Sequence, residues 1–260
     1  MTMKLDQLVA ECWRMYDEAK NIDFVVKPSI PILFFGDSDR YSHSKIRVVT
    51  VGLNPSKSEF PDGNRFQRFP DAQGIYPEIL NEKHIEKYLS ALNNYFRRRP
   101  YGQWFDSYEP VLNGLGSSYY DANESTALHT DLCSPLATNP TWKGLTYHQQ
   151  ESLEYEGIKL WRNLLSILRP DLVVVSIANK HLEKMKIVER WKNIFIVKRK
   201  NPYTAKSSKL NIDDKATATI IFGKAAQTPF GTLSYDDKRR MGSLIASMLR
   251  ARASATTIIR

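Results

Sequence analysis

The chain has 260 residues and a mass of 29.9 kDa, which is enough to bury a full core in one domain. Its 37 Lys and Arg residues exceed its 28 Asp and Glu residues, and the net charge of +9 favours a polyanionic partner. The two cysteines, Cys12 and Cys133, are too few for a thiolate cluster, so we expect no metal and no other cofactor. No apolar run is long enough to cross a bilayer, and residues 1–7 lack the apolar stretch of a secretory signal. We therefore expect a cytoplasmic monomer without membrane contact.

Taken in chain order, the apolar spacing predicts alternating helices and strands. A helix is expected at 5–21 and a first, buried strand at 46–51. Strands that alternate with helices favour an α/β fold, a three-layer α/β/α sandwich with a mostly parallel central sheet. We expect one domain over residues 1–260, with a helical extension at 1–45 and a core at 46–245. Further helices are expected at 84–99, 101–115, 154–168 and 236–250, and further strands at 127–132, 172–177, 193–197 and 217–222.

The first strand ends in Gly52-Leu53-Asn54-Pro55-Ser56. Gly52 permits a close backbone approach, and Pro55 restrains Asn54 to an extended backbone. Open α/β sheets bind ligands at the carboxyl ends of their strands, so the Asn54 amide stands where a ligand is expected. An ordinary strand-to-loop turn is the alternative, because Asn and Pro are common turn residues.

This strand followed by Gly-Leu-Asn-Pro-Ser resembles the first motif of the uracil-DNA glycosylase superfamily. It is most similar to the mismatch-specific and single-strand-selective branches, in which Asn replaces the Asp of the uracil-specific enzymes. The order of the later segments is also similar: a second strand ending in a polar residue, a third strand at 169–175 and a late strand, loop and helix. The resemblance implies a uracil-DNA glycosylase-like fold and a monofunctional DNA glycosylase, which flips a nucleotide out of DNA and hydrolyses its N-glycosidic bond. In that role Asn54 orients the attacking water, and Gly52 and Leu53 border the base.

The second strand ends at Asp131, where the uracil-specific enzymes have an Asn. An amide matches uracil, whereas a protonated carboxyl matches the inverted edge of cytosine, because it accepts from N4 and donates to N3. Donation to N3 also makes the base a better leaving group. We therefore assign Asp131 to catalysis and recognition; a solvent-exposed Asp that caps the following turn is the alternative. His129 is expected to face away from Asp131, since side chains alternate along a strand.

Ser56 stands where the uracil-specific enzymes have a Tyr that crowds C5 of the pyrimidine. The smaller serine leaves space, so Ser56 and Asp131 together imply a cytosine with a C5 substituent, such as hydroxymethylcytosine or its glucosylated form. Removal of ordinary cytosine would damage the cell's own genome, which favours a modified base of bacteriophage DNA and a role in anti-phage defence. A simple turn or helix-start residue is the alternative for Ser56.

Two aromatic residues follow Asn54 at about the distance at which the family supplies a stacking surface. These are Phe66 and Phe69, and stacking is worth roughly 1–3 kcal/mol per base. Arg65 and Arg68 directly precede them and would contact phosphates. Packing of either phenylalanine in the core is the alternative.

Two late segments compete for the role of the DNA-contacting loop. In 223–234, Phe230 or Leu233 would be an apolar wedge that enters the vacated stack. The competing segment is 198–203, and neither contains the His-Pro-Ser sequence of the uracil-specific enzymes. The further DNA contacts expected in these segments are Lys200, Lys224, Gln227 and Thr228.

Two other functions stay open from the sequence. One is a repair glycosylase for uracil or another deaminated base. The other is a catalytically silent module that binds DNA, since a fold does not establish an activity.

Overall fold

A seven-stranded sheet forms the centre of the protein, with strand order β2-β3-β1-β4-β7-β6-β5. The computed structural model describes residues 4–76, 78, 80–120 and 124–257, of which 252–257 are described as backbone only. The first five strands in this order run parallel, and β6 and β5 continue the sheet in antiparallel pairing. The strands are β1 (Val48–Gly52), β2 (Ser117–Ser118), β3 (Ser125–Asp131), β4 (Leu172–Val175), β5 (Lys192–Val197), β6 (Tyr203–Asp213) and β7 (Ala216–Gly223).

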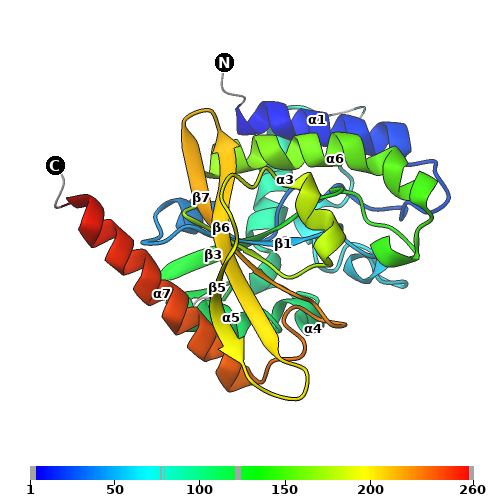
Figure 1. The fold of residues 1–260 in the computed structure, drawn as a ribbon. Helices are drawn as coiled ribbons and strands as arrows, with labels where there is room; N and C mark the ends of the chain where they lie inside the picture. The colour runs from blue at the N-terminus through cyan, green and yellow to red at the C-terminus, as the bar shows by residue number, and fades with distance from the viewer. Residues whose placement is uncertain (1–3, 77, 79, 121–123, 258–260) are drawn as a thin grey trace.

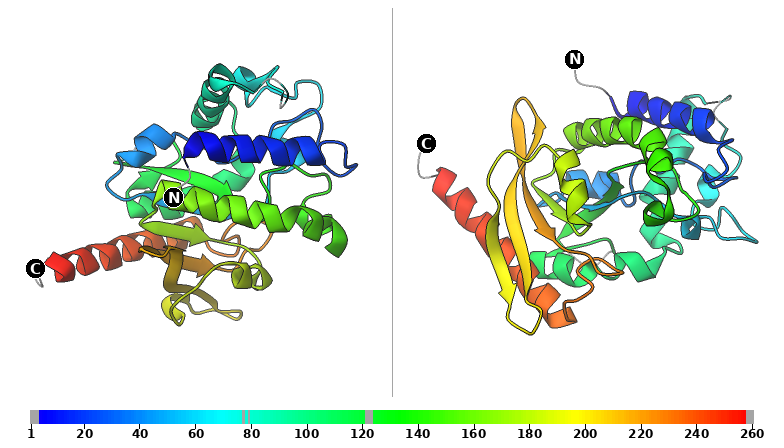
Figure 2. Two further views of the ribbon diagram at one scale, coloured as in Figure 1. Left: turned by 90° about the horizontal axis from the view of Figure 1, so that it is seen from above. Right: turned by 45° about the vertical axis from the view of Figure 1, so that its right-hand side comes forward.

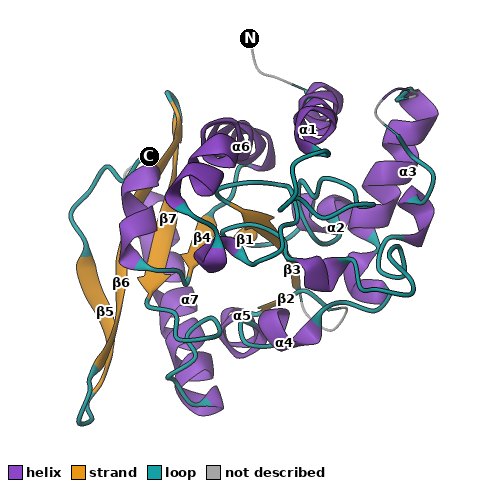
Figure 3. Cartoon of the chain, turned by 90° about the vertical axis from the view of Figure 1, so that its right-hand side faces the viewer, coloured by secondary structure: helices purple, strands orange, loops and turns teal. Residues whose placement is uncertain are grey.

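Helices cover both faces of the sheet, and this confirms the three-layer α/β expectation (Figures 1 and 3). α1 and α6 pack against each other on one face, and α5 and α7 pack against each other on the other. The helices are α1 (Leu5–Ala19), α2 (Ser38–Ser42), α3 (Glu82–Asn93), α4 (Gly102–Phe105), α5 (Glu109–Leu115), α6 (Tyr147–Leu168) and α7 (Tyr235–Thr257). Short 3-10 turns are η1 (Lys57–Glu59), η2 (Pro70–Ala72), η4 (Tyr95–Arg97), η5 (Trp142–Gly144) and η6 (Asn179–Lys184). None of the helices in the described part of the chain has the length and apolar character needed to cross a bilayer.

The expected strands are all present, and the sheet has two that the sequence pattern did not indicate. β1 and β4 are buried along their whole length, as continuous apolar runs in the middle of a parallel sheet should be. β6 was missed because its buried positions include small and polar residues such as Ala205 and Ser207, which do not read as an apolar face. The other missed strand, β2, has only two residues.

Two of the expected helices are interrupted. The helix expected at 84–99 ends at Asn93, after which the chain turns through η4. The helix expected at 101–115 is divided into α4 and α5, and α5 begins with Pro110 in its first turn, where a missing N–H breaks no helical bond.

The N-terminal segment is part of the core, so the expectation of an extension at 1–45 is corrected. Trp13 on α1 is buried, and α1 packs on α6. Farther along, Phe35 forms a backbone bridge to His129 in β3, and its side chain is buried. The segment therefore completes the layer over the central strands.

The parallel strands bring their carboxyl ends to one edge of the sheet. Gly52 at the end of β1 is the register partner of Asp131 at the end of β3, and Val51 is the partner of Val175 in β4. The chain leaves β1 towards the β2 side and leaves β4 towards the β5 side, so the connections diverge next to β1. Ligands in open α/β sheets bind at such a divergence, which is where Asn54 follows β1.

The opposite ends of the molecule are marked by α3 and by the hairpin of β5 and β6. Figure 2 (left) and Figure 3 both show these elements far apart, with the central strands between them. The central strands therefore lie between a helical region at α3 and a hairpin of two strands at β5 and β6.

Candidate active site

The loops that follow β1 and β3 continue to pair after the strands end. Gly52 and Asp131 are partners in the last register position of the strands. Beyond them, the N–H of Cys133 donates to Leu53 O at 2.8 Å, and Thr138 continues the pairing farther along the same loop. This backbone ladder holds the two predicted site segments side by side.

The Asn54 side chain has one defined orientation. Its Nδ2 donates to Leu136 O at 3.1 Å and to Thr138 Oγ1 at 2.9 Å. Thr138 Oγ1 donates its own hydrogen to Pro140 O at 2.8 Å, so it can only accept from Asn54. Both contacts therefore require the amide nitrogen on this side, and Oδ1 is left as an acceptor that no described residue occupies.

Position 52 must be a glycine, because side chains of β3 lie against its Cα. A Cβ on Gly52 would lie 2.4 Å from Asp131 Oδ1 and 2.9 Å from His129 Nε2. The prediction that Gly52 permits a close approach is confirmed, and the group that approaches is the Asp131 carboxyl.

Asp131 is buried, with its side chain 4% exposed. This burial rules out the alternative of a solvent-exposed capping residue. Its Oδ1 lies 3.7 Å from His129 Nε2, so the expectation that His129 faces away from Asp131 is wrong. Residues two apart in a strand share a face, because the alternation has a period of two.

A buried chain of polar groups leads from His129 into the core. His129 Nδ1 lies 2.7 Å from Thr50 Oγ1, and Thr50 Oγ1 is also hydrogen bonded to the hydroxyl of Tyr119. Burial raises the pKa of Tyr119 well above its usual range, so this hydroxyl stays protonated. The rings of Phe105 and Tyr108 pack around His129. These contacts hold the imidazole firmly beside Asp131.

Glu59 is a buried carboxyl near the site that sequence reasoning missed. It is 4% exposed, accepts a hydrogen bond from the Tyr95 hydroxyl at 2.6 Å, and lies 3.8 Å from Arg68 Nε. Burial raises the pKa of Glu59 to about 7, and the charge of Asp131 adds to the rise. The signal in the sequence was an acidic residue beside an aromatic one, Phe60, shortly after Asn54.

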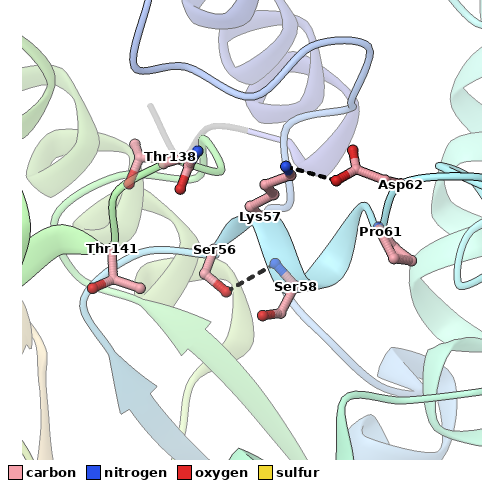
Figure 4. Close-up of a pocket in the computed structure, with 8 residues that line it drawn as sticks. Ser56, Lys57, Ser58, Pro61, Asp62, Thr138 and Thr141 are labelled. Carbon is pink, nitrogen blue, oxygen red and sulfur yellow. Dashed lines mark hydrogen bonds and ion pairs between the residues drawn. The ribbon is translucent and has the colours of Figure 1, made fainter.

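Ser56 caps a 3-10 turn and also lines an open pocket. Its Oγ accepts from the Ser58 N–H at 3.2 Å and caps η1, as the helix-start alternative requires. It also lines a pocket of about 400 Å³ (Figure 4), and Thr138, which holds the Asn54 amide, lines the same pocket. The pocket is lined by Ser56, Lys57, Ser58, Pro61, Asp62, Thr138, Asn139 and Thr141.

The two candidate stacking residues differ in exposure. Phe69 is 0% exposed and stacks between Phe60 and Tyr95, with ring centroids 5.6 and 5.2 Å away. The core alternative therefore holds for Phe69, and its expected stacking role is corrected. Phe66 is only partly buried against Phe60, and its stacking role stays a prediction.

Arg65 and Arg68 are engaged within the protein. Arg65 pairs with Asp62 at 2.7 Å and donates to Phe60 O. Arg68 donates to Ser58 O and to a second backbone carbonyl, and it faces the buried Glu59. The expected phosphate contact of Arg68 is therefore corrected, because its guanidinium is held against Glu59 and backbone carbonyls. Arg65 is paired with the exposed Asp62, and its phosphate contact stays a prediction.

The two competing late segments are neighbours in space. Arg199 Nη1, in the turn between β5 and β6, donates to Thr232 O at 2.6 Å. The Tyr203 hydroxyl donates to Lys224 O at 3.2 Å. Both segments therefore belong to one surface at the end of the sheet.

The expected apolar wedge is not exposed. Phe230 is 0% exposed, and its N–H donates to Ser176 Oγ at 2.8 Å just after β4. Leu233 is buried as well. The loop is fastened by Lys238, whose Nζ lies 2.7 Å from Ser107 Oγ and 3.1 Å from Pro229 O. The wedge prediction is therefore corrected, since both side chains belong to the core.

The polar residues expected to contact DNA at this end are accessible. Lys200 lies in the exposed turn after β5. Lys224 and Gln227 are exposed in the loop after β7, and Thr228 is partly exposed.

A cluster beside the site has residue types that could hold a metal ion. Cys133, Glu154 and His181 place potential ligand atoms within 4.8 Å of one another. Burial raises the pKa of the Cys133 thiol and lowers the pKa of His181 to about 4, so both are neutral near pH 7. Zinc accepts such ligands, but the ammonium of Lys184 already pairs with Glu154 and balances its charge. We therefore assign the cluster no metal.

No protein-family model matches the chain, and no curated protein matches it in sequence. The resemblance to uracil-DNA glycosylases thus depends on the Gly52–Ser56 motif and the order of the segments.

Proposed function

We propose that the protein is a monofunctional DNA glycosylase, which extrudes a pyrimidine nucleotide from DNA and hydrolyses its N-glycosidic bond. The observation that supports this most directly is the fixed amide of Asn54 at the carboxyl end of β1. Both of its N–H groups are bound within the protein, so its Oδ1 can accept a hydrogen from a water molecule without any rearrangement. Such preorganisation is how enzymes position weak nucleophiles.

The chemistry uses Asn54 and Asp131 in different roles. The bond between C1′ and N1 breaks, its electron pair stays with the base, and a proton from Asp131 neutralises the base at N3. The water held by Asn54 forms the new bond to C1′ and releases its proton to solvent. Because an amide is a feeble base, most of the bond cleavage precedes attack, with a cationic sugar that the site and the DNA phosphates stabilise.

The favoured substrate is a 5-modified cytosine, such as hydroxymethylcytosine or glucosyl-hydroxymethylcytosine of phage DNA, and the role is anti-phage defence in the cytoplasm. The buried carboxyl of Asp131 supports recognition of the cytosine edge. The pocket of about 400 Å³ lined by Ser56 and Thr138 supports a substituent at C5, since it is open and adjoins the residue that holds Asn54.

The test is release of free base from a panel of DNA duplexes by wild type, Asn54→Ala and Asn64→Ala. The panel contains uracil, a thymine mismatch, cytosine, 5-hydroxymethylcytosine and glucosyl-hydroxymethylcytosine. We expect release of modified cytosine by wild type and by the control Asn64→Ala, whose side chain is exposed. Asn54→Ala should lose about 100-fold or more of the rate and keep its DNA affinity.

Three outcomes would contradict the proposal. Equal rates in Asn54→Ala and wild type would remove the role of the amide. Release of uracil alone would favour the repair glycosylase. No release from any duplex, with DNA binding intact, would favour the silent module.

A further inference from the structure

The positive charge of the chain is concentrated in one stretch. Residues 180–209 contain ten Lys or Arg and two Glu, a net charge of +8 against +9 for the whole protein. The stretch covers η6, β5 and the first part of β6. The remainder of the chain is therefore close to neutral, and the polyanion-binding signal read from composition comes from this region.

Seven basic side chains of this stretch are exposed and unpaired: Lys180 and the six that follow η6. In the part of the chain that the structure describes, none of them forms an ion pair. Basic residues elsewhere commonly form ion pairs: Arg47 pairs with Asp171 at 3.1 Å, and Arg169 pairs with Asp213 at 2.6 Å. We call the six that follow η6 the basic hairpin; its residues are Lys186, Arg190, Lys192, Lys198, Lys200 and Lys206.

The turn of the basic hairpin, with Lys198 and Lys200, adjoins the edge of the sheet that carries the candidate active site. β5 runs in the same direction as β7, and Ala205 of β6 pairs with Gly223 at the carboxyl end of β7. The Arg199 contact to Thr232 joins the hairpin turn to the loop that follows β7. That loop is tied through Phe230 to Ser176, directly after β4 and next to β1.

We propose that the basic hairpin binds the phosphates of the DNA that flanks the extruded nucleotide. This inference rests on the proposed glycosylase function and adds the path of the DNA to it. β5 has six residues, about 20 Å, which matches about the axial length of five or six nucleotides. Lys192 is the first residue of β5 and Lys198 directly follows its last. Unpaired lysines at the two ends of this length exchange their counterions for phosphates independently of sequence.

Protection of a sheet edge is the competing explanation of these lysines. β5 is the last strand of the sheet, and lysines on edge strands prevent pairing between molecules. However, Lys206 lies on β6, which is paired on both sides, and Lys200 lies in the turn. Neither position protects an edge, so charge complementarity to DNA explains the group better.

The test compares two triple variants that remove the same charge. The first is Lys198→Ala/Lys200→Ala/Lys206→Ala. The control is Lys83→Ala/Lys87→Ala/Lys215→Ala, with exposed lysines on α3 and in the turn between β6 and β7. Figure 3 shows α3 at the opposite end of the molecule from the hairpin.

Binding to an unmodified duplex is measured at a series of salt concentrations. We expect the hairpin variant to reduce the slope of log affinity against log salt by about 2 to 3, and the control to leave it within about 0.5 of wild type. Unfolding curves of both variants should match wild type, because all six side chains are exposed.

The readout separates this inference from the proposed function. Binding of an unmodified duplex needs no excision, so a protein that releases no base can still show the hairpin effect. Equal slopes in the two variants would overturn the inference. If the hairpin variant also self-associated, edge protection would be the role of these lysines.

Discussion

Two regions lie at the same edge of the sheet. One is formed by the ends of β1 and β3, and the other by β5, β6 and the loop after β7. They hold their polar groups in opposite ways. At the first, Asn54, Asp131 and His129 are tied to partners or buried beside one another. At the second, charged residues such as Lys200 and Lys224 are exposed, while the apolar Phe230 is inside the core.

The difference indicates that the two regions suit different tasks, a reaction at the first and attraction of a polyanion at the second. A reaction needs groups whose geometry is set before the substrate arrives, and burial with complete hydrogen bonding provides this. Attraction of a polyanion needs only accessible charge, which acts over distance and tolerates motion. Substitutions in the two regions test this contrast.

Asp131→Asn tests whether the buried carboxyl selects and activates the base. The amide can no longer donate a proton to N3, so we expect release of modified cytosine to fall by roughly 10² to 10⁴-fold, with some release of uracil gained. Single-turnover assays on both duplexes measure this. An unchanged preference would show that Asp131 does not face the base.

Phe230→Ala tests the correction at the late surface. Because Phe230 is a core residue, its truncation to Ala should lower the free energy of unfolding by about 3–5 kcal/mol. Thr232→Ala, an exposed residue of the same loop, is the control and should change stability by less than about 0.5 kcal/mol. Urea unfolding measures both; a stable Phe230→Ala protein with weaker DNA binding would restore the wedge.

Gly52→Ala tests how tightly the site is built. The new Cβ would meet Asp131 Oδ1 at 2.4 Å, and we expect a loss of about 1–3 kcal/mol in stability. Gly52→Ala/Asp131→Ala removes the closest contact and should recover part of that loss in a double-mutant cycle. Independent, additive effects would contradict the close packing of these residues.

Glu59→Gln gives the smallest expected effect and tests the buried carboxyl near Asp131. The pKa of Glu59 is about 7 in the folded protein against 4.5 ordinarily, so between these values only the folded state binds the proton. Its contribution to stability is therefore full below pH 4.5 and is lost as the pH rises through 7. Wild type should lose about 1–2 kcal/mol more than the variant between pH 5.5 and 8.

The comparison of wild type with Glu59→Gln is needed because Glu109 titrates in the same direction. Burial also raises the pKa of Glu109, so wild type alone would not isolate Glu59. Urea midpoints at the two pH values, measured for both proteins, give the difference. Parallel pH curves would contradict the raised pKa of Glu59.

The parallel sheet, and the position of Asn54 and Asp131 at its carboxyl edge, could be predicted from the amino-acid sequence. Apolar runs such as 172–175 identify buried strands, and the residue after a strand must lie at the sheet's end. The position of a buried strand and of the residue after it depend on the local sequence, so periodicity and turn chemistry are sufficient to predict both.

Which aromatic and charged residues are buried became visible in the folded protein alone. Phe69 and Phe230 have the same appearance in the sequence as an exposed stacking residue, and Arg68 has that of a phosphate contact. Their burial or pairing depends on segments far away in the chain, such as Tyr95 for Phe69 and Ser176 for Phe230. Periodicity along one segment carries no information about such partners, because they are brought together by packing of the whole core.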